Sequence, residues 1–138
     1  MKRVLIICTS NSCRSQMAEG LVNNLLRDSW TAHSAGIKSS SVNPHAITVM
    51  SEIDIDISRQ YSKSIADVNN LSTFDLIVTV CDDAAEQCPN VHTNTPQIHL
   101  GFEDPAKYGV RPPEEALPYF RNVRDDIRDR LITLLLLR

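Results

Sequence analysis

Two cysteines and one arginine lie close together near the start of the chain, in the segment CTSNSCRS at residues 8–15. Arg14 follows Cys8 by six residues, and Ser15 comes directly after the arginine. A thiolate is a nucleophile, and a guanidinium presents a fixed fork of donors that suits the oxygens of a tetrahedral oxyanion. These residue types at this spacing predict that Cys8 attacks a bound oxyanion while Ser15 donates a hydrogen bond to the thiolate.

A second pair of cysteines, Cys81 and Cys88, lies in the segment VTVCDDAAEQCP. The residues between them predict a short helix, with acidic residues in its first turn and Pro89 at its end. Seven residues of helix rise by about 10.5 Å, whereas a disulfide needs Cα atoms within about 7 Å of each other. A bond between these two cysteines would therefore require the helix to unwind, which costs little for a helix so short. Buried structural thiols are the alternative interpretation of this pair.

The composition of the chain excludes several classes of protein. The chain has 138 residues and a formal net charge of −3, which argues against a nucleic-acid partner. The spacing of its four cysteines lacks the C-x2-C pattern of zinc sites, so we expect neither a metal nor a cofactor. The N-terminal apolar run is too short for a signal peptide, and the C-terminal leucines are too few to span a bilayer. We therefore predict a cytoplasmic protein without membrane contact.

The elements that must position these residues alternate between strands and helices. Short apolar runs predict strands at residues 3–8, 30–37, 74–81 and 97–100. Apolar residues at helical spacing predict helices at residues 15–28, 43–53 and 62–71, and a long C-terminal helix that begins near Tyr119, after Pro118. This alternation predicts an α/β fold, a single domain over residues 1–138 with a four-stranded parallel sheet and helices on both faces. Cys8 and Cys81 would then lie at the carboxyl ends of strands, where such sheets bind ligands.

The loop between the first strand and the following helix is predicted to hold the oxyanion. A helix N-terminus offers backbone amides and a partial positive charge, and a curled loop directs further amides inward as an anion nest. Asn11 suits the left-handed backbone conformation that a nest requires. These surroundings favour the thiolate form of Cys8, whereas Cys13 is interpreted as a structural thiol. The predicted oxyanion-binding residues are Thr9, Ser10, Asn11, Ser12, Cys13 and Arg14.

The segment CTSNSCRSQMAEG resembles the loop of the low-molecular-weight tyrosine phosphatases. It resembles still more closely the loop of the thioredoxin-coupled arsenate reductases built on the same fold. The resemblance continues through SAGI, VNP, DIDIS, VTVC, DP and FR-VRD-I, so it covers nearly the whole chain. Two positions depart from the pattern: Gln16 stands where the phosphatases usually have proline, and Ser10 stands where the reductases commonly carry glycine.

The resemblance implies that arsenate is reduced to arsenite by a relay of disulfides. Cys8 attacks arsenic while Asp104 protonates the departing oxygen. Cys81 then attacks Cys8 and arsenite leaves, after which Cys88 attacks Cys81 and thioredoxin reduces the resulting disulfide. We expect a monomer whose partners are arsenate and thioredoxin. The predicted catalytic residues are Cys8, Cys81, Cys88, Arg14, Asp104 and Ser15.

Other functions are compatible with the same residues. A phosphatase that acts on a phosphoester through a Cys8 phosphoenzyme would use the same loop and Asp104. In the phosphatases, however, an aromatic residue follows the D-P pair, and Ala106 stands there in this chain. A non-catalytic oxyanion or redox sensor would signal through a Cys81–Cys88 disulfide. Glutaredoxin with glutathione is the alternative reductant.

Some members of the resembling family bind potassium beside the loop. Asn11, Glu19 and Ser34 match that group, but Lys63 stands where a further acidic residue is expected. A lysine ammonium can supply the positive charge itself. We therefore predict no potassium site and an activity that does not depend on this ion.

Overall fold

A parallel sheet forms the centre of the computed structural model, which describes residues 1–82, 91 and 93–138. Its strands are β1 (Lys2–Cys8), β2 (Trp30–Gly36), β3 (Leu76–Thr79) and β4 (Gln97–His99). All neighbouring strands are parallel, in the order β2-β1-β3-β4. β1 is buried from Val4 to Cys8 without alternation, as expected for a strand covered on both faces. The predicted four-stranded parallel sheet is confirmed.

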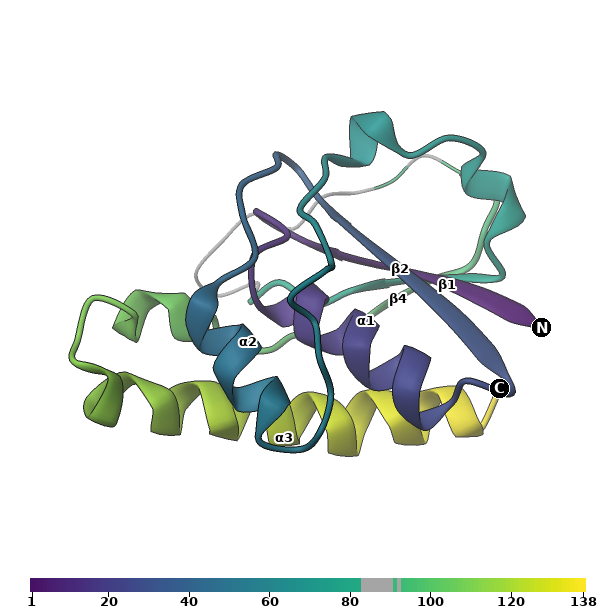
Figure 1. Ribbon diagram of the computed structural model, residues 1–138. Helices are drawn as coiled ribbons and strands as arrows, with labels where there is room; N and C mark the ends of the chain where they lie inside the picture. Colours follow the sequence, from purple (N-terminus) through teal and green to yellow (C-terminus); the bar gives the residue numbers. More distant parts are fainter. Residues whose placement is uncertain (83–90, 92) are drawn as a thin grey trace.

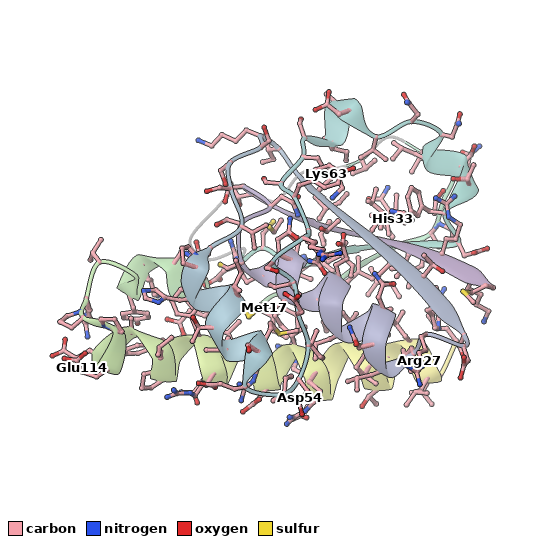
Figure 2. All side chains as sticks on the ribbon, in the orientation of Figure 1. Met17, Arg27, His33, Asp54, Lys63 and Glu114 are labelled. Carbon is pink, nitrogen blue, oxygen red and sulfur yellow. The ribbon has the colours of Figure 1, made fainter. Side chains whose placement is uncertain are left out.

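Three α-helices lie together on one face of this sheet (Figure 1). They are α1 (Arg14–Leu25), α2 (Pro44–Ser51) and α3 (Pro113–Leu136). α2 begins as its sequence predicts, because the Asn43 side chain accepts a hydrogen bond from the amide of His45 and Pro44 occupies the first helical position. Met17, labelled in Figure 2, is fully buried and belongs to the core that α1 forms with the sheet and the other two helices.

The opposite face of the sheet is covered by a long connection that carries two short 3-10 helices, η1 (Ile65–Asp67) and η2 (Leu71–Thr73) (Figure 1). A smaller apolar cluster lies beneath them, where Phe74 packs with Leu5 and Ile7 of β1. The single helix predicted for residues 62–71 is therefore wrong. Asn70, with a left-handed φ of 57°, separates the two short turns.

The C-terminal helix also begins earlier than its sequence predicts. We expected it near Tyr119, but α3 begins at Pro113 and contains Pro118. Proline is tolerated at the first helical position. Pro118 forfeits the hydrogen bond to the carbonyl of Glu114 and crowds that carbonyl, but Glu114 is an exposed residue that water can reach. The uninterrupted helix buries one face, made up of Ala116, Phe120, Val123, Ile127, Leu131 and Leu135.

No helix within the described ranges is long and apolar enough to cross a membrane.

A third 3-10 helix, η3 (Pro105–Tyr108), follows the segment that leaves β4. The helix predicted between Cys81 and Cys88 falls outside the described residues, which end at Asp82 and resume at Val91.

Candidate functional site

The loop at residues 8–15 joins β1 to α1, as its sequence predicts. Cys8 is the last residue of β1 and only 2% exposed, and Arg14 is the first residue of α1. Asn11 has a φ of 53° and is the one residue of this loop in the left-handed region, so the prediction for its backbone is confirmed. Ser10 does not adopt a positive φ, and a serine at this position therefore brings no backbone strain.

Three carbonyl groups of the loop are bonded on its outer side. Thr9 O accepts from the amides of Ile37 and Lys38 at 2.8 and 3.3 Å, and Ser12 O accepts from the amide of Asn43 at 2.9 Å. Ser10 O accepts from two hydroxyl groups, as described below. Because the C=O and N–H of a trans peptide point in opposite directions, the amides that follow these carbonyls face the inner side of the loop. This arrangement suits the anion nest that the sequence predicts.

The Cys8 sulfur receives hydrogen bonds from within the loop. Its Sγ lies 2.8 Å from Ser15 Oγ and 3.3 Å from the amide nitrogen of Asn11. Asn11 Nδ2 donates to Ser15 Oγ at 2.8 Å. That donation uses one lone pair of the Ser15 hydroxyl, and the hydroxyl proton is free to point to the Cys8 sulfur. The Cys8 sulfur therefore has the Asn11 amide and the Ser15 hydroxyl as neighbours within hydrogen-bonding distance.

The Asn11 side chain makes hydrogen bonds to four other residues around the loop. Besides Ser15, its Nδ2 donates to Ser34 Oγ at 2.9 Å. Its Oδ1 accepts from the Lys63 amide at 2.9 Å and from Gln16 Nε2 at 3.0 Å. Four bonds from one buried amide hold the left-handed residue in place, and this makes the loop rigid.

Sequence reasoning missed the part that glutamines play here. Gln16 is fully buried, and its Nε2 also donates to the carbonyl groups of Asn11 and Tyr61 at 3.1 Å. Gln60 Nε2 in turn donates to the Oε1 of Gln16 at 2.8 Å. One indication of this role was present in the sequence: residue 16 is glutamine where the phosphatases usually have proline. Gln16 ties the start of α1 to residues 60–61 through hydrogen bonds that a proline could not make.

Gly36 allows β2 to end directly against the loop. A Cβ atom at this position would lie 2.8 Å from both the Asn11 nitrogen and the Thr9 oxygen, and these are backbone atoms. A side chain here would therefore push the loop away from the sheet. The glycine in the segment SAGI follows from this close approach.

Arg14 and Asp104 come together at the mouth of the loop, as predicted. The buried guanidinium donates from Nη1 to the Phe102 carbonyl at 3.2 Å, and its Nη2 lies 3.6 Å from Asp104 Oδ2. Asp104 caps η3, where its Oδ1 accepts from the Ala106 amide at 2.9 Å. The Asp104 side chain is 40% exposed, so a ligand can reach it while Arg14 stays fixed.

Cys13 is a buried thiol that contacts Asp104. Its Sγ donates to Asp104 Oδ1 at 3.4 Å. Burial raises the pKa of the Cys13 thiol well above its usual range, and the neighbouring Asp104 carboxylate raises it further. These surroundings keep Cys13 protonated, in agreement with its interpretation as structural.

Cys81 is fully buried and follows β3 at the carboxyl edge of the sheet. The amide of Val80 donates to the Ile7 carbonyl at 2.8 Å, so the chain stays paired with β1 up to the residue before Cys81. Cys8, the last residue of β1, and Cys81, two residues after β3, therefore lie at the carboxyl ends of neighbouring strands. Cys88 lies outside the described residues.

Glu19 lies buried beneath the loop with two polar contacts. Ser34 Oγ donates to Glu19 Oε1 at 2.9 Å, and Lys63 Nζ lies 3.8 Å from the same oxygen. Burial raises the pKa of Glu19, and Lys63 and Ser34 partly oppose this shift. Glu19 is the acidic residue of the group that the resemblance matches to potassium binding, and the Lys63 ammonium lies beside it.

Comparison with known proteins agrees with this architecture. Residues 3–137 match the family of low molecular weight phosphotyrosine protein phosphatases. An arsenate reductase of Halalkalibacterium halodurans is 48% identical over 132 residues, covering 96% of this chain and 94% of that protein. An arsenate reductase of Bacillus subtilis is 46% identical over 131 residues, covering 94% and 92%. The crystal structure of an arsenate reductase from Archaeoglobus fulgidus matches with a TM-score of 0.79 and 32% identity, covering 96% of this chain and 98% of that chain.

The sequence match spans almost the whole chain, and the solved structure has the same fold. The order of strands, the loop after β1 and the helix that follows it form one unit within the matched residues. The chain belongs to the low molecular weight phosphotyrosine protein phosphatase family.

Proposed function

We propose that the chain reduces arsenate to arsenite, with Cys8 as the nucleophile. The two relatives at 46% and 48% identity are arsenate reductases, which supports this choice within the family. The observation that carries the proposal is the buried Cys81 beside the strand end that bears Cys8. Hydrolysis of a phosphoester needs one thiol in this loop, whereas reduction of arsenate needs a second thiol to take over the bond to Cys8.

Arsenate is held by the inward amides of residues 9–14 and by Arg14. The Cys8 thiolate attacks arsenic, and an oxygen of arsenate leaves as water with a proton from Asp104. Ser15 supports the thiolate before the attack through its hydroxyl proton. Arg14 is fixed by the Phe102 carbonyl, and its second nitrogen, beside the Asp104 carboxylate, donates to the oxyanion.

The relay then moves two electrons from sulfur to arsenic. Cys81 attacks the Cys8 sulfur, the sulfur–arsenic bond breaks, and its electron pair stays on arsenic, which leaves as arsenite. Cys88 attacks Cys81, so Cys8 returns to the thiolate and a Cys81–Cys88 disulfide forms. The dithiol of thioredoxin reduces this disulfide and restores the starting state.

The proposal is tested by NADPH consumption in the presence of arsenate, thioredoxin and thioredoxin reductase. The Cys88→Ser variant should lose turnover, because its Cys8–Cys81 disulfide is not resolved. Mass mapping after one equivalent of arsenate should find residues 81 and 88 joined in the wild-type protein. Free thiols at both positions in a protein that turns over would contradict the relay. Turnover with glutaredoxin and glutathione but not with thioredoxin would contradict the choice of reductant.

Phosphatase activity is the second candidate, and it is favoured by the loop and by Asp104, which such a reaction would share. Ala106 provides no aromatic surface for a phosphotyrosine ring. The Cys88→Ser variant separates the two candidates, since hydrolysis of p-nitrophenyl phosphate needs no relay. A wild-type protein that hydrolyses this ester but consumes no NADPH with arsenate would favour the phosphatase.

A further inference from the structure

Two serines that are distant in sequence hold one peptide group of the loop. Ser40 Oγ and Ser62 Oγ each donate to Ser10 O at 3.1 Å. The amide of Ser40 also donates to Ser62 Oγ at 2.8 Å, which joins the two segments to each other. Ser40 lies in the connection from β2 to α2, and Ser62 lies in the segment before η1.

The same peptide group carries the amide that reaches the nucleophile. Ser10 O and Asn11 N belong to one trans peptide, so they point in opposite directions. The oxygen faces the two serine hydroxyls, while the amide donates to Cys8 Sγ at 3.3 Å. Any rotation that moves the oxygen away from the hydroxyls also moves the N–H away from the sulfur.

The opposite orientation of this peptide would harm the site. It would aim the partially negative carbonyl oxygen of Ser10 toward the Cys8 sulfur and toward the position of a bound oxyanion. The neighbouring carbonyls of Thr9 and Ser12 accept from backbone amides, which no substitution except proline removes. The Ser10 carbonyl accepts from the side chains of exposed Ser40 and half-buried Ser62, so substitutions can remove the bonds that hold its oxygen.

We propose that Ser40 and Ser62 are positioning residues that fix the Ser10–Asn11 peptide, so that its N–H stabilises negative charge on Cys8 and on the oxyanion. The effect on Cys8 stands independently of the substrate, and the effect on the oxyanion rests on the proposed function. Both serines act through the peptide and do not touch the reacting atoms. Their removal should therefore change the charge state of the thiol as well as turnover.

The test follows alkylation of Cys8 by iodoacetamide across pH, with the modified peptide quantified by mass spectrometry. In the Ser40→Ala/Ser62→Ala double variant, the midpoint of this pH profile should move upward by roughly half a unit to one unit, as expected for partial loss of a hydrogen bond to a charged group. Each single variant should move it less. The KM for arsenate should rise severalfold, because the oxyanion loses the same donor.

Matched variants separate positioning from general stability. Ser39→Ala makes the same change one residue away and should leave the pH profile as in the wild type. Ser62→Thr keeps a hydroxyl and should restore most of the wild-type profile. A double variant with the wild-type midpoint would overturn the proposal, whether or not its melting temperature falls. A moved midpoint in a protein that does not reduce arsenate would support the positioning role and contradict the proposed function instead.

Discussion

Replacing Lys63 with methionine should destabilise the protein, and more at pH 7 than at pH 5. Lys63 Nζ lies 3.8 Å from Glu19 Oε1, and the two side chains are only 18% and 11% exposed. Lys63, labelled in Figure 2, belongs to the segment that also donates its amide to Asn11. Methionine keeps a flexible apolar stem of similar length and removes the ammonium, with its contacts to Glu19 and to the Tyr61 carbonyl and ring. Of these contacts, the one with the Glu19 carboxylate depends on the charge of a group that titrates in the acid range.

The magnitude follows from the degree of burial. Two charges at about 4 Å attract by about 4 kcal/mol at an effective dielectric constant near 20. Exposed ion pairs contribute about 0–1 kcal/mol, and loss of one partner of a buried pair costs about 3–5 kcal/mol. Since the Lys63–Glu19 pair lies between these limits, we expect Lys63→Met to lower the free energy of unfolding by about 2 kcal/mol at pH 7.

The dependence on pH follows from the pKa of Glu19. Burial raises this pKa above its ordinary value of 4.5, and Lys63 is the first of the contributions that lower it. A raised pKa in the folded state means that the contribution of Glu19 to stability is fully present below pH 4.5 and is lost as the pH rises through the folded value. Removal of Lys63 raises the folded pKa further, so the variant loses more stability between pH 5 and pH 7 than the wild type does.

Urea denaturation at pH 5 and pH 7 measures both effects. Lys38→Met is the matched control, because Lys38 is exposed and its backbone amide contact with Thr9 survives the change. The control should unfold as the wild type does. An equal loss of stability at both pH values in Lys63→Met would refute the electrostatic argument, since it would assign the loss to packing.

Three further predictions concern the loop and its surroundings. Gly36→Ala should lower the free energy of unfolding by about 1–3 kcal/mol and abolish most activity, because the new Cβ would collide with backbone atoms of Thr9 and Asn11. An unchanged urea denaturation curve would contradict this prediction. Ser15→Ala should slow alkylation of the nucleophilic thiol at pH 7 about tenfold, for loss of one hydrogen bond to a thiolate; an unchanged rate would show that the hydroxyl does not stabilise it. Exchange of potassium for sodium at equal ionic strength should leave activity and melting temperature unchanged, and a strong loss of either would refute the role given to Lys63.

The local features of the site were predictable from sequence because they depend on near neighbours. The left-handed Asn11, the strand that ends at Cys8 and the cap at Asn43 each follow from residue type and short spacing. The start of α3 was not predictable in this way, because burial of its apolar face outweighs the single hydrogen bond that Pro118 forfeits. The helix expected at residues 62–71 was wrong, since side chains there lie against the sheet over two separate turns.

Contacts between distant segments account for what the sequence did not predict. Gln16 bonds to Tyr61, and Ser10 bonds to Ser40 and Ser62, across separations of 30 to 52 residues. Nothing in the periodicity of either segment indicates which of its polar residues faces the loop. The approach of Arg14 to Asp104 is also distant in sequence, and only the resemblance to a known family placed the two residues at one site.

The network around Asn11 has a consequence for how the protein would choose its ligand. Hydrogen bonds made entirely within the chain shape the cradle, so its form does not depend on the arriving anion. Arsenate and phosphate have the same shape and charge, so a rigid loop of this kind would bind both with similar affinity. Discrimination must therefore occur after binding, when arsenic accepts an electron pair that phosphorus does not take from a thiol. High concentrations of phosphate would therefore inhibit such a protein by competing for the loop. Bound phosphate would not oxidise its cysteines.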